Sequence, residues 1–236
     1  MITAPKKNEI VISSKPRVAF LGVGWIGLNR MKALALSEYV DVTAVADPDA
    51  SRRREASECV PGAPLLLDLD EILAERPEAV VIATPNALHA DQTIQALEAK
   101  CAVFCQKPLS RTAKETQEVV GAARRADRLL GVDLSYRHLS ATAAIRNALQ
   151  SGEIGEIYAV QGMFHNAYGP DKTWFYDSGQ SGGGCVLDLG VHLIDLVLYL
   201  LDFPNVTEVH SRLYHHGKRL RSPSRDVEDY ASIQME

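Results

Sequence analysis

Hydrophobic and polar positions follow two different patterns along the chain, and the patterns meet near residue 135. Between residues 16 and 135, short apolar runs are separated by amphipathic stretches whose apolar residues stand three or four positions apart. The expected strands are 17–21, 42–46, 65–67, 79–83, 102–105 and 129–134, with helices at 69–75, 87–99 and 112–125 and an amphipathic stretch ending near residue 37. This alternation predicts an α/β fold with a doubly wound parallel sheet of the Rossmann type.

The second pattern is strand-rich. Strands are expected at 156–164, 206–214 and 230–235, with helices at 141–150 and 187–201 and a glycine-rich loop at 179–184. Strands in succession predict an α+β domain with an open, mostly antiparallel sheet. We therefore divide the chain into an N-terminal extension (1–15) ending in a short strand, a Rossmann domain (16–135) and an incomplete second domain (136–236).

Composition excludes several classes of protein. The net charge of −5 gives no basic surface for nucleic acid or an anionic membrane. No apolar stretch is expected to span a bilayer, and the first residues lack the apolar core of a signal peptide. The four cysteines form no C-x-x-C pair, and Cys101 and Cys105 share one strand face as small hydrophobes. This usage predicts a reducing, cytoplasmic location.

A glycine-rich turn follows the first expected strand. Its G-x-G-x-x-G pattern gives Gly22, Gly24, Trp25, Ile26 and Gly27 as candidate cofactor contacts. Asp47 ends the next strand, at the spacing of the acid that binds the adenosine ribose of a dinucleotide, although a structural turn with a chance acid is the alternative. A carboxylate would repel a 2′-phosphate, so NAD is favoured. NADP remains an alternative, because Arg52 or Arg53 would reach such a phosphate if Asp47 turned aside.

Two further motifs stand at the carboxyl ends of expected strands. The candidate cofactor contacts are Thr84, Pro85, Asn86 and His89 after the fourth strand, and Gln106 and Lys107 after the fifth. The alternatives are that Thr84 or Asn86 only caps the next helix, and that His89 is a surface residue. Lys107 is expected to project over the cleft and donate a hydrogen bond to a substrate oxygen. Its alternative is a solvated lysine.

The long helix of the second domain carries three ionisable residues on one face. Asp188, His192 and Asp195 stand at i, i+4 and i+7 among leucine, valine and isoleucine. Ionisable groups on an apolar helix cost desolvation energy unless they are paired or functional. Histidine suits general acid–base work, with Asp188 orienting it or contacting the substrate. A buried hydrogen-bond network and a metal pair are the alternatives, and no metal is predicted because no third ligand is evident.

Other residues complete the expected substrate pocket. The candidate substrate contacts are Lys107, Arg137, His165, Trp174, Asp188 and His192. Arg137 follows the sixth strand, where the domains would join, and an interdomain salt bridge is as good an interpretation of it. His215 and His216 are interpreted as a solvated strand end.

The motifs together resemble the glucose–fructose oxidoreductase / inositol dehydrogenase (Gfo/Idh/MocA) family from Arg17 to Glu236. They are GVGWIG, ATPNALH, QKP and GGGCVLDLGVHLIDLVLYLL, in this order. The resemblance implies an NAD(P)-binding domain, a C-terminal domain with a large open sheet, and hydride transfer to or from a sugar, inositol or related hydroxyl. It also implies that Lys107, Asp188 and His192 occupy the family's catalytic positions, with His192 as proton acceptor.

The chain departs from the family pattern twice. The family tripeptide is usually Glu-Lys-Pro, and Gln106 removes that negative charge beside Lys107. Family members are also longer, so we expect an incomplete second domain that associates with further copies through an exposed sheet edge. Beside a dehydrogenase or reductase of sugars or polyols, two alternatives stay open. They are an NAD-dependent glycosidase of the same fold, without net NADH, and a non-catalytic dinucleotide-binding regulator, against which the three catalytic matches argue.

Overall fold

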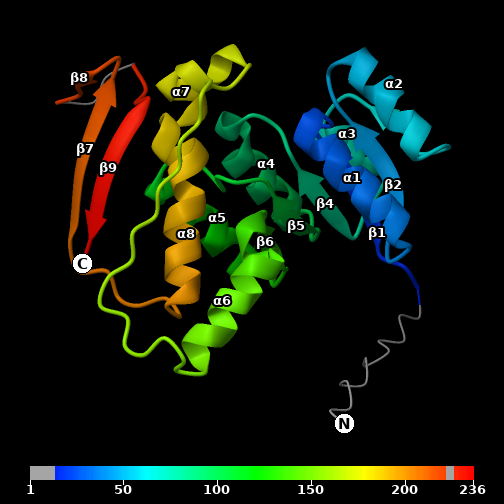
Figure 1. Ribbon diagram of the computed structural model, residues 1–236. Helices are drawn as coiled ribbons and strands as arrows, with labels where there is room; N and C mark the ends of the chain where they lie inside the picture. The colour runs from blue at the N-terminus through cyan, green and yellow to red at the C-terminus, as the bar shows by residue number, and fades with distance from the viewer. Residues whose placement is uncertain (1–13, 222–225) are drawn as a thin grey trace, which may run out of the picture.

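The computed structural model describes residues 14–221 and 226–236, so the extension up to residue 13 and its expected strand lie outside the described residues (Figure 1). The N-terminal half alternates strands and helices as the apolar pattern predicts. Its elements are β1 (Arg17–Leu21), α1 (Trp25–Ser37), β2 (Asp41–Ala46), α2 (Ala50–Cys59), β3 (Leu65–Leu66), α3 (Leu69–Ala74), β4 (Ala79–Ile82), α4 (Asn86–Glu98), β5 (Ala102–Cys105), α5 (Ala113–Ala126) and β6 (Leu130–Val132).

The six strands form one parallel sheet in the order β3-β2-β1-β4-β5-β6. The predicted doubly wound sheet is therefore confirmed. Its strand order reverses between β1 and β4, and in such sheets ligands bind in the crevice beyond the carboxyl ends of the strands at this point. The motifs after β1, β4 and β5 all lie at this edge.

Alternation along the strands divides the core between the two faces of the sheet. On β1, Ala19 and Leu21 pack with residues of α3, α4 and α5, whereas Val18 and Phe20 pack with α1 and α2. Every second side chain of a strand points to the same face, so both faces are apolar and both are covered. Cys101 and Cys105 lie in the first cluster, as predicted for small hydrophobes.

The C-terminal half begins with helical segments and ends in a small sheet. Its elements are η1 (Ser135–His138), α6 (Ser140–Gln150), η2 (Thr173–Tyr176), α7 (Ser178–Ser181), η3 (Val186–Gly190), α8 (Val191–Leu200), β7 (Val209–His215), β8 (Lys218–Arg219) and β9 (Tyr230–Met235). The strands pair antiparallel in the order β8-β7-β9, as the α+β pattern predicts. Figure 1 shows α8 beside β7 and β9.

Two local predictions for this half are wrong. The segment 156–164 is not a strand, because no neighbouring strand among the described residues supplies its ladder hydrogen bonds, and most of its residues are exposed. Its chain runs near α8, where a side chain at Gly162 would contact Leu193. The glycine-rich loop also contains a helical turn, α7, because the Asp177 side chain caps it by accepting a hydrogen bond from Gly179 N.

The expectation that no stretch is long enough to cross a membrane is also wrong. The helical run Ser178–Leu200, which includes α7, η3 and α8, satisfies length and apolarity criteria for a span. One such helix is weak evidence for a membrane, and this one carries Asp188, His192 and Asp195, which are costly in a lipid bilayer. Two of these residues form ion pairs with Lys107 and Arg137, so the polar side of the helix has partners within the protein.

Candidate active site

The glycine loop after β1 has the geometry that a dinucleotide requires. Gly22 has a φ of +83°, and a Cβ there would lie 2.7 Å from the carbonyl oxygen of Ala83. A Cβ at Gly27 would overlap the Gly22 carbonyl, so this glycine lets the helix pack closely on the strand. A Cβ at Gly24 would meet only the Arg52 guanidinium, at 3.6 Å, which leaves that backbone open to a pyrophosphate at the N-terminus of α1. The residues present therefore fit the cofactor.

Asp47 braces this loop. Its side chain is buried, with Oδ2 accepting from Val23 N and Oδ1 from Asp49 N, each at 2.9 Å. Arg52 Nη1 lies 3.7 Å from the same carboxylate. Trp25, the first residue of α1, is 81% exposed beside the loop, where it is free to cover a bound ligand. The expected contacts of Trp25 and Ile26 with the cofactor stay predictions.

The motif after β4 does not act as a helix cap, which was the alternative to a cofactor contact for Thr84 and Asn86. Neither Thr84 nor Asn86 caps α4, whose N-cap is Pro85 without a side-chain hydrogen bond. Thr84 instead donates to Gln92, and the buried Asn86 Nδ2 donates to the Ser181 carbonyl at 2.9 Å. Asn86 thus links the Rossmann sheet edge to α7 of the second half.

His89 is buried, so the surface interpretation is wrong for it as well. Its Nδ1 lies 2.7 Å from the Pro108 carbonyl oxygen and its Nε2 2.7 Å from that of Thr84. Burial lowers the pKa of His89, against the raising effect of the two carbonyls. The ring therefore joins the chain segments after β4 and β5, which carry Thr84 and Lys107.

Lys107 and Asp188 join the two halves at the candidate catalytic centre. Lys107 Nζ donates to Asp188 Oδ1 at 2.8 Å and to the Asp188 carbonyl oxygen at 2.7 Å. The lysine is the second residue after β5, and the aspartate belongs to the π-helical turn η3. Both side chains are largely buried, with 16% and 22% exposed. The solvated alternative for Lys107 is therefore wrong, whereas its expected hydrogen bond to a substrate oxygen over the cleft stays a prediction.

His192 lies on the next turn, with its ring stacked on Tyr136 at 4.5 Å between centroids and 15° between planes. Its Nδ1 is buried and has no hydrogen-bond partner among the described residues. Burial and then the Lys107 ammonium lower the pKa of His192, against three carboxylates, Asp188 first. A neutral imidazole with a free nitrogen is competent to accept a proton. Asp188, expected to orient this ring, instead binds Lys107.

The third acid of the helix pairs with Arg137. Asp195 accepts from both Nε and Nη2 of the guanidinium, and this carboxylate raises the pKa of Arg137. The pair joins η1 to α8, and both residues fall within the second domain as divided above (136–236), so it is not the interdomain salt bridge considered for Arg137. A direct contact of Arg137 with substrate stays a prediction.

Sequence analysis missed two polar groups around the centre. Asp133 is 6% exposed after β6 and binds Arg30 and Gln106. Glu228 is 7% exposed before β9; its carbonyl accepts from Cys185 N and its carboxylate from Val186 N. A Cβ at Gly184 would overlap the Glu228 backbone. The position of Asp133 directly after a strand was a signal that it lies at the ligand-binding edge of the sheet. Nothing in the sequence around Glu228 indicates its contact with the start of the long helix.

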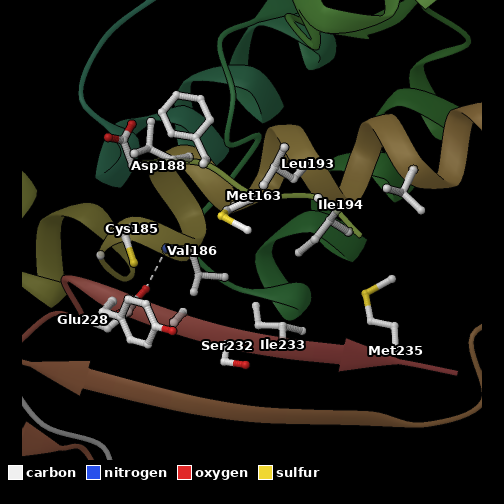
Figure 2. Close-up of a pocket in the computed structure, with 18 of the residues that line it drawn as sticks. Met163, Cys185, Val186, Asp188, Leu193, Ile194, Glu228, Ser232, Ile233 and Met235 are labelled. Carbon is white, nitrogen blue, oxygen red and sulfur yellow. Dashed lines mark hydrogen bonds between the residues drawn. The ribbon is translucent and has the colours of Figure 1, made fainter. Parts of the chain in front are cut away.

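A groove of about 1110 Å³ lies between α8, β9 and the segment 157–170. Figure 2 shows it lined by apolar side chains such as Leu193, Ile194 and Ile233, with the Val186–Glu228 hydrogen bond at one end. His165 lines this groove, whereas Trp174 stacks on Phe175 at 3.8 Å. The groove includes Asp188 but neither Lys107 nor His192. It is therefore mainly a different surface from the catalytic centre, and the expected roles of His165 and Trp174 stay predictions.

A separate group of possible metal ligands lies where β7 ends and β9 begins. Ligand atoms of His215, His216 and Asp229 lie within 4.8 Å of one another, and His216 Nδ1 is 3.2 Å from the Asp229 carboxylate. His216 is 80% exposed, as expected of a solvated strand end. His215 Nδ1 is 2.8 Å from the Val227 carbonyl.

A Rossmann sheet and a glycine loop that fits a dinucleotide, with Lys107 at the same sheet edge, define the class of NAD-binding proteins. Residues 16–134 match the model of an oxidoreductase family with an NAD-binding Rossmann fold, and residues 142–236 match the GFO/IDH/MocA C-terminal domain. The chain belongs to the GFO/IDH/MocA family, and its N-terminal half is an NAD-binding domain.

Similar proteins act on sugars or bind NAD. The chain is 30% identical over 211 residues to D-glucoside 3-dehydrogenase of Escherichia coli (strain K12), covering 88% of this chain and 60% of that protein. It is 28% identical to glucose-6-phosphate 3-dehydrogenase of Bacillus subtilis (strain 168), covering 92% and 63%. An NAD-binding protein from Listeria innocua superposes with a TM-score of 0.81 at 30% identity, covering 94% and 64%. GenD2 from gentamicin A biosynthesis, in complex with NAD, gives 0.81 at 26% identity, covering 99% and 65%. The chain thus spans less than two thirds of these relatives' length.

Proposed function

We propose that the protein is an NAD-dependent dehydrogenase or reductase acting on a secondary hydroxyl, or the matching carbonyl, of a sugar or related polyol. One observation carries this proposal. Lys107 lies at the same sheet edge as the glycine loop and is anchored on Asp188, close to His192, whose buried Nδ1 has no hydrogen-bond partner in the part of the chain that the structure describes. Such a pair supplies a hydrogen-bond donor and a base at one place, as oxidation of an alcohol requires.

The residues divide the chemistry between them. Bound NAD supplies the hydride acceptor. The Lys107 ammonium donates to the reacting substrate oxygen and stabilises the charge that develops there. His192 accepts the hydroxyl proton as the carbon–hydrogen bond breaks and its electron pair leaves with the hydride. Asp188 holds the Lys107 side chain in place by accepting its hydrogen bond, and the stacked Tyr136 fixes the plane of the imidazole. In reduction the same groups act in reverse.

The substrate class rests on the relatives. Two of those named above are 3-dehydrogenases of a glucoside and of glucose 6-phosphate. We therefore propose a pyranose derivative as substrate. We also propose that Arg137, which is paired with Asp195, and His165 and Trp174 contact the substrate.

The test is NADH formation by the purified protein with a panel of glucosides, free sugars and inositols. Stoichiometric NADH with at least one member supports the proposal. Product release without net NADH would instead indicate the NAD-dependent glycosidase. NAD binding without turnover of any member in either direction would contradict the enzyme and favour a cofactor-binding regulator.

We also propose that the protein is cytoplasmic and associates with further copies through its C-terminal sheet. Four free cysteines are compatible with a reducing compartment. Val209 and Tyr230 expose apolar surface on the small sheet, at 59% and 57%, and exposed strand edges promote association. Size-exclusion chromatography with light scattering tests the second point, and a monomer at high concentration would contradict it.

A further inference from the structure

Three polar side chains from distant parts of the chain meet next to the catalytic lysine. Arg30 of α1 donates from Nε to Asp133 Oδ2 at 2.6 Å and from Nη2 to Oδ1 at 3.2 Å. Gln106 Nε2 donates to the same Oδ2 at 3.0 Å. Gln106 Oε1 accepts from the main-chain N–H of Lys107 at 2.9 Å. We call Arg30, Gln106 and Asp133 the Asp133 cluster.

The partners fix the orientation of the Gln106 amide. A carboxylate only accepts hydrogen bonds and a main-chain N–H only donates, so the NH₂ group must face Asp133 and the oxygen must face Lys107. Asp133 is 6% exposed, and burying a charge is costly unless it is paired and hydrogen-bonded. Arg30 supplies the pairing charge and Gln106 a further donor. Every member of the cluster therefore has a defined role.

This arrangement explains why an amide stands where the family tripeptide usually has an acid. A glutamate side chain at position 106 would put a second carboxylate at hydrogen-bond distance from Asp133. Two ionised carboxylates at that distance repel each other, and an amide at position 106 avoids this repulsion. The negative charge is therefore still present beside Lys107, but it stands on the neighbouring strand end, after β6 instead of after β5.

We propose that Asp133 is a positioning residue of the active site, which holds the Lys107 main chain through Gln106 and supplies the fixed negative charge of this cleft edge. The inference rests on the proposed function, since it assigns Asp133 to the same centre. Because Arg30 belongs to the helix that begins at the glycine loop, the cluster also ties that helix to the segment carrying the catalytic lysine.

The Asp133 charge also acts on His192. The groups that affect the imidazole are Lys107, which lowers its pKa together with burial, and Asp188, Asp133 and Asp195, which raise it. Removing the Asp133 charge must therefore lower the pKa of His192, and adding a charge at position 106 must raise it. A neutral base is needed for oxidation, so the acidic limb of the pH–rate profile should follow the pKa of His192.

A reciprocal charge exchange tests the proposal, with the full chain and its best sugar substrate. We expect Gln106→Glu and Asp133→Asn each to lower kcat/KM about tenfold, equivalent to about 1.4 kcal/mol. The acidic limb should move to higher pH in the first variant and to lower pH in the second. The double variant keeps one negative charge and should return to within about threefold of the parent, with its limb restored. Asp41→Asn, the same change at an exposed position where β2 begins, should alter neither property.

A second readout separates this inference from the proposed function. The titration of His192 by NMR, in the same variants and without substrate, should shift in opposite directions for the two single changes. Opposite shifts without any sugar oxidation by the parent would leave the charge placement standing and remove the proposed function. The inference would be overturned if the parent were active and all four variants kept the same pKa of His192 and the same acidic limb of the pH–rate profile. Variants that differed only in thermal stability would show that the cluster has a purely structural role.

Discussion

The two halves of the molecule bury their apolar side chains to very different extents. Both faces of the six-stranded sheet are covered, and all members of the two core clusters lie between Val18 and Ala126. In the C-terminal half, Val227 is the only buried hydrophobic residue among those the structure describes, whereas Tyr158 is 98% exposed. The ion pair between Lys107 and Asp188 crosses between these halves. The proposed chemistry therefore depends on contacts between a closed core and a region with exposed apolar surface.

The largest expected effect is on kcat and concerns Lys107 of the N-terminal half and His192 of the C-terminal half. We expect Lys107→Ala and His192→Ala each to lower kcat by roughly 10²–10⁴-fold, since each removes a group that acts on the reacting oxygen or its proton. The affinity for NAD should stay within about threefold for His192→Ala, because the glycine loop belongs to the other half.

The control is Lys114→Ala, which removes an exposed lysine of α5. Steady-state kinetics with NADH detection, together with a titration of NAD, measure both quantities. A near-normal rate for His192→Ala would exclude this histidine as the base.

The next effect compares the same substitution in the two sheets. Val80 of β4 is completely buried, and Val209 of β7 is 59% exposed. We expect Val80→Ala to lower the free energy of unfolding by about 2 kcal/mol, from lost transfer energy and a cavity. Val209→Ala should cost less than about 0.5 kcal/mol. Denaturant unfolding measures both, and equal losses would show that the C-terminal sheet is as well packed as the Rossmann sheet.

The same contrast explains which parts of the fold could be predicted from the sequence. Strands such as 79–83 are bounded by local signals, and their apolar pattern directly reports burial on both faces. The segment 156–164 has the alternation of a strand but no partner in the described structure, so alternation alone was insufficient. Pairing depends on distant residues that a local pattern does not contain.

The candidate site shows the same division. Lys107, Asp188 and His192 were found because each belongs to a recognisable local motif. The partner of each side chain was not predictable, because it comes from elsewhere in the chain: Asp188 binds Lys107 instead of His192, and Asn86 binds the Ser181 carbonyl instead of capping α4. Burial of His89 was missed for the same reason, since its carbonyl partners lie on two different strand ends.

A smaller effect concerns the preference of the N-terminal, cofactor-binding half for NAD over NADP. We expect NAD to bind about tenfold more tightly than NADP, equivalent to about 1.4 kcal/mol. The reason is the Asp47 carboxylate, which is fixed at the loop by Val23 N and Asp49 N and would repel a 2′-phosphate. Calorimetric titration with both cofactors measures the ratio. Tighter binding of NADP would show that Arg52, close to both Asp47 and Gly24, determines the preference instead.

The smallest effect concerns a neutral hydrogen bond that joins the halves. Asn86 begins α4, and its buried side chain donates to the Ser181 carbonyl, 95 residues away in the chain. We expect Asn86→Ala to lower the free energy of unfolding by about 1 kcal/mol, the usual contribution of one such bond. Asn29→Ala is the matched control, because its side chain donates to Trp25 O within the exposed surface of α1, and it should cost less. Denaturant unfolding followed with NAD titration separates two roles for Asn86. A loss of stability with NAD affinity within about twofold of the parent would show that Asn86 connects the two halves. Unchanged stability with weakened NAD binding would show that Asn86 contacts the cofactor, and would contradict the connecting role.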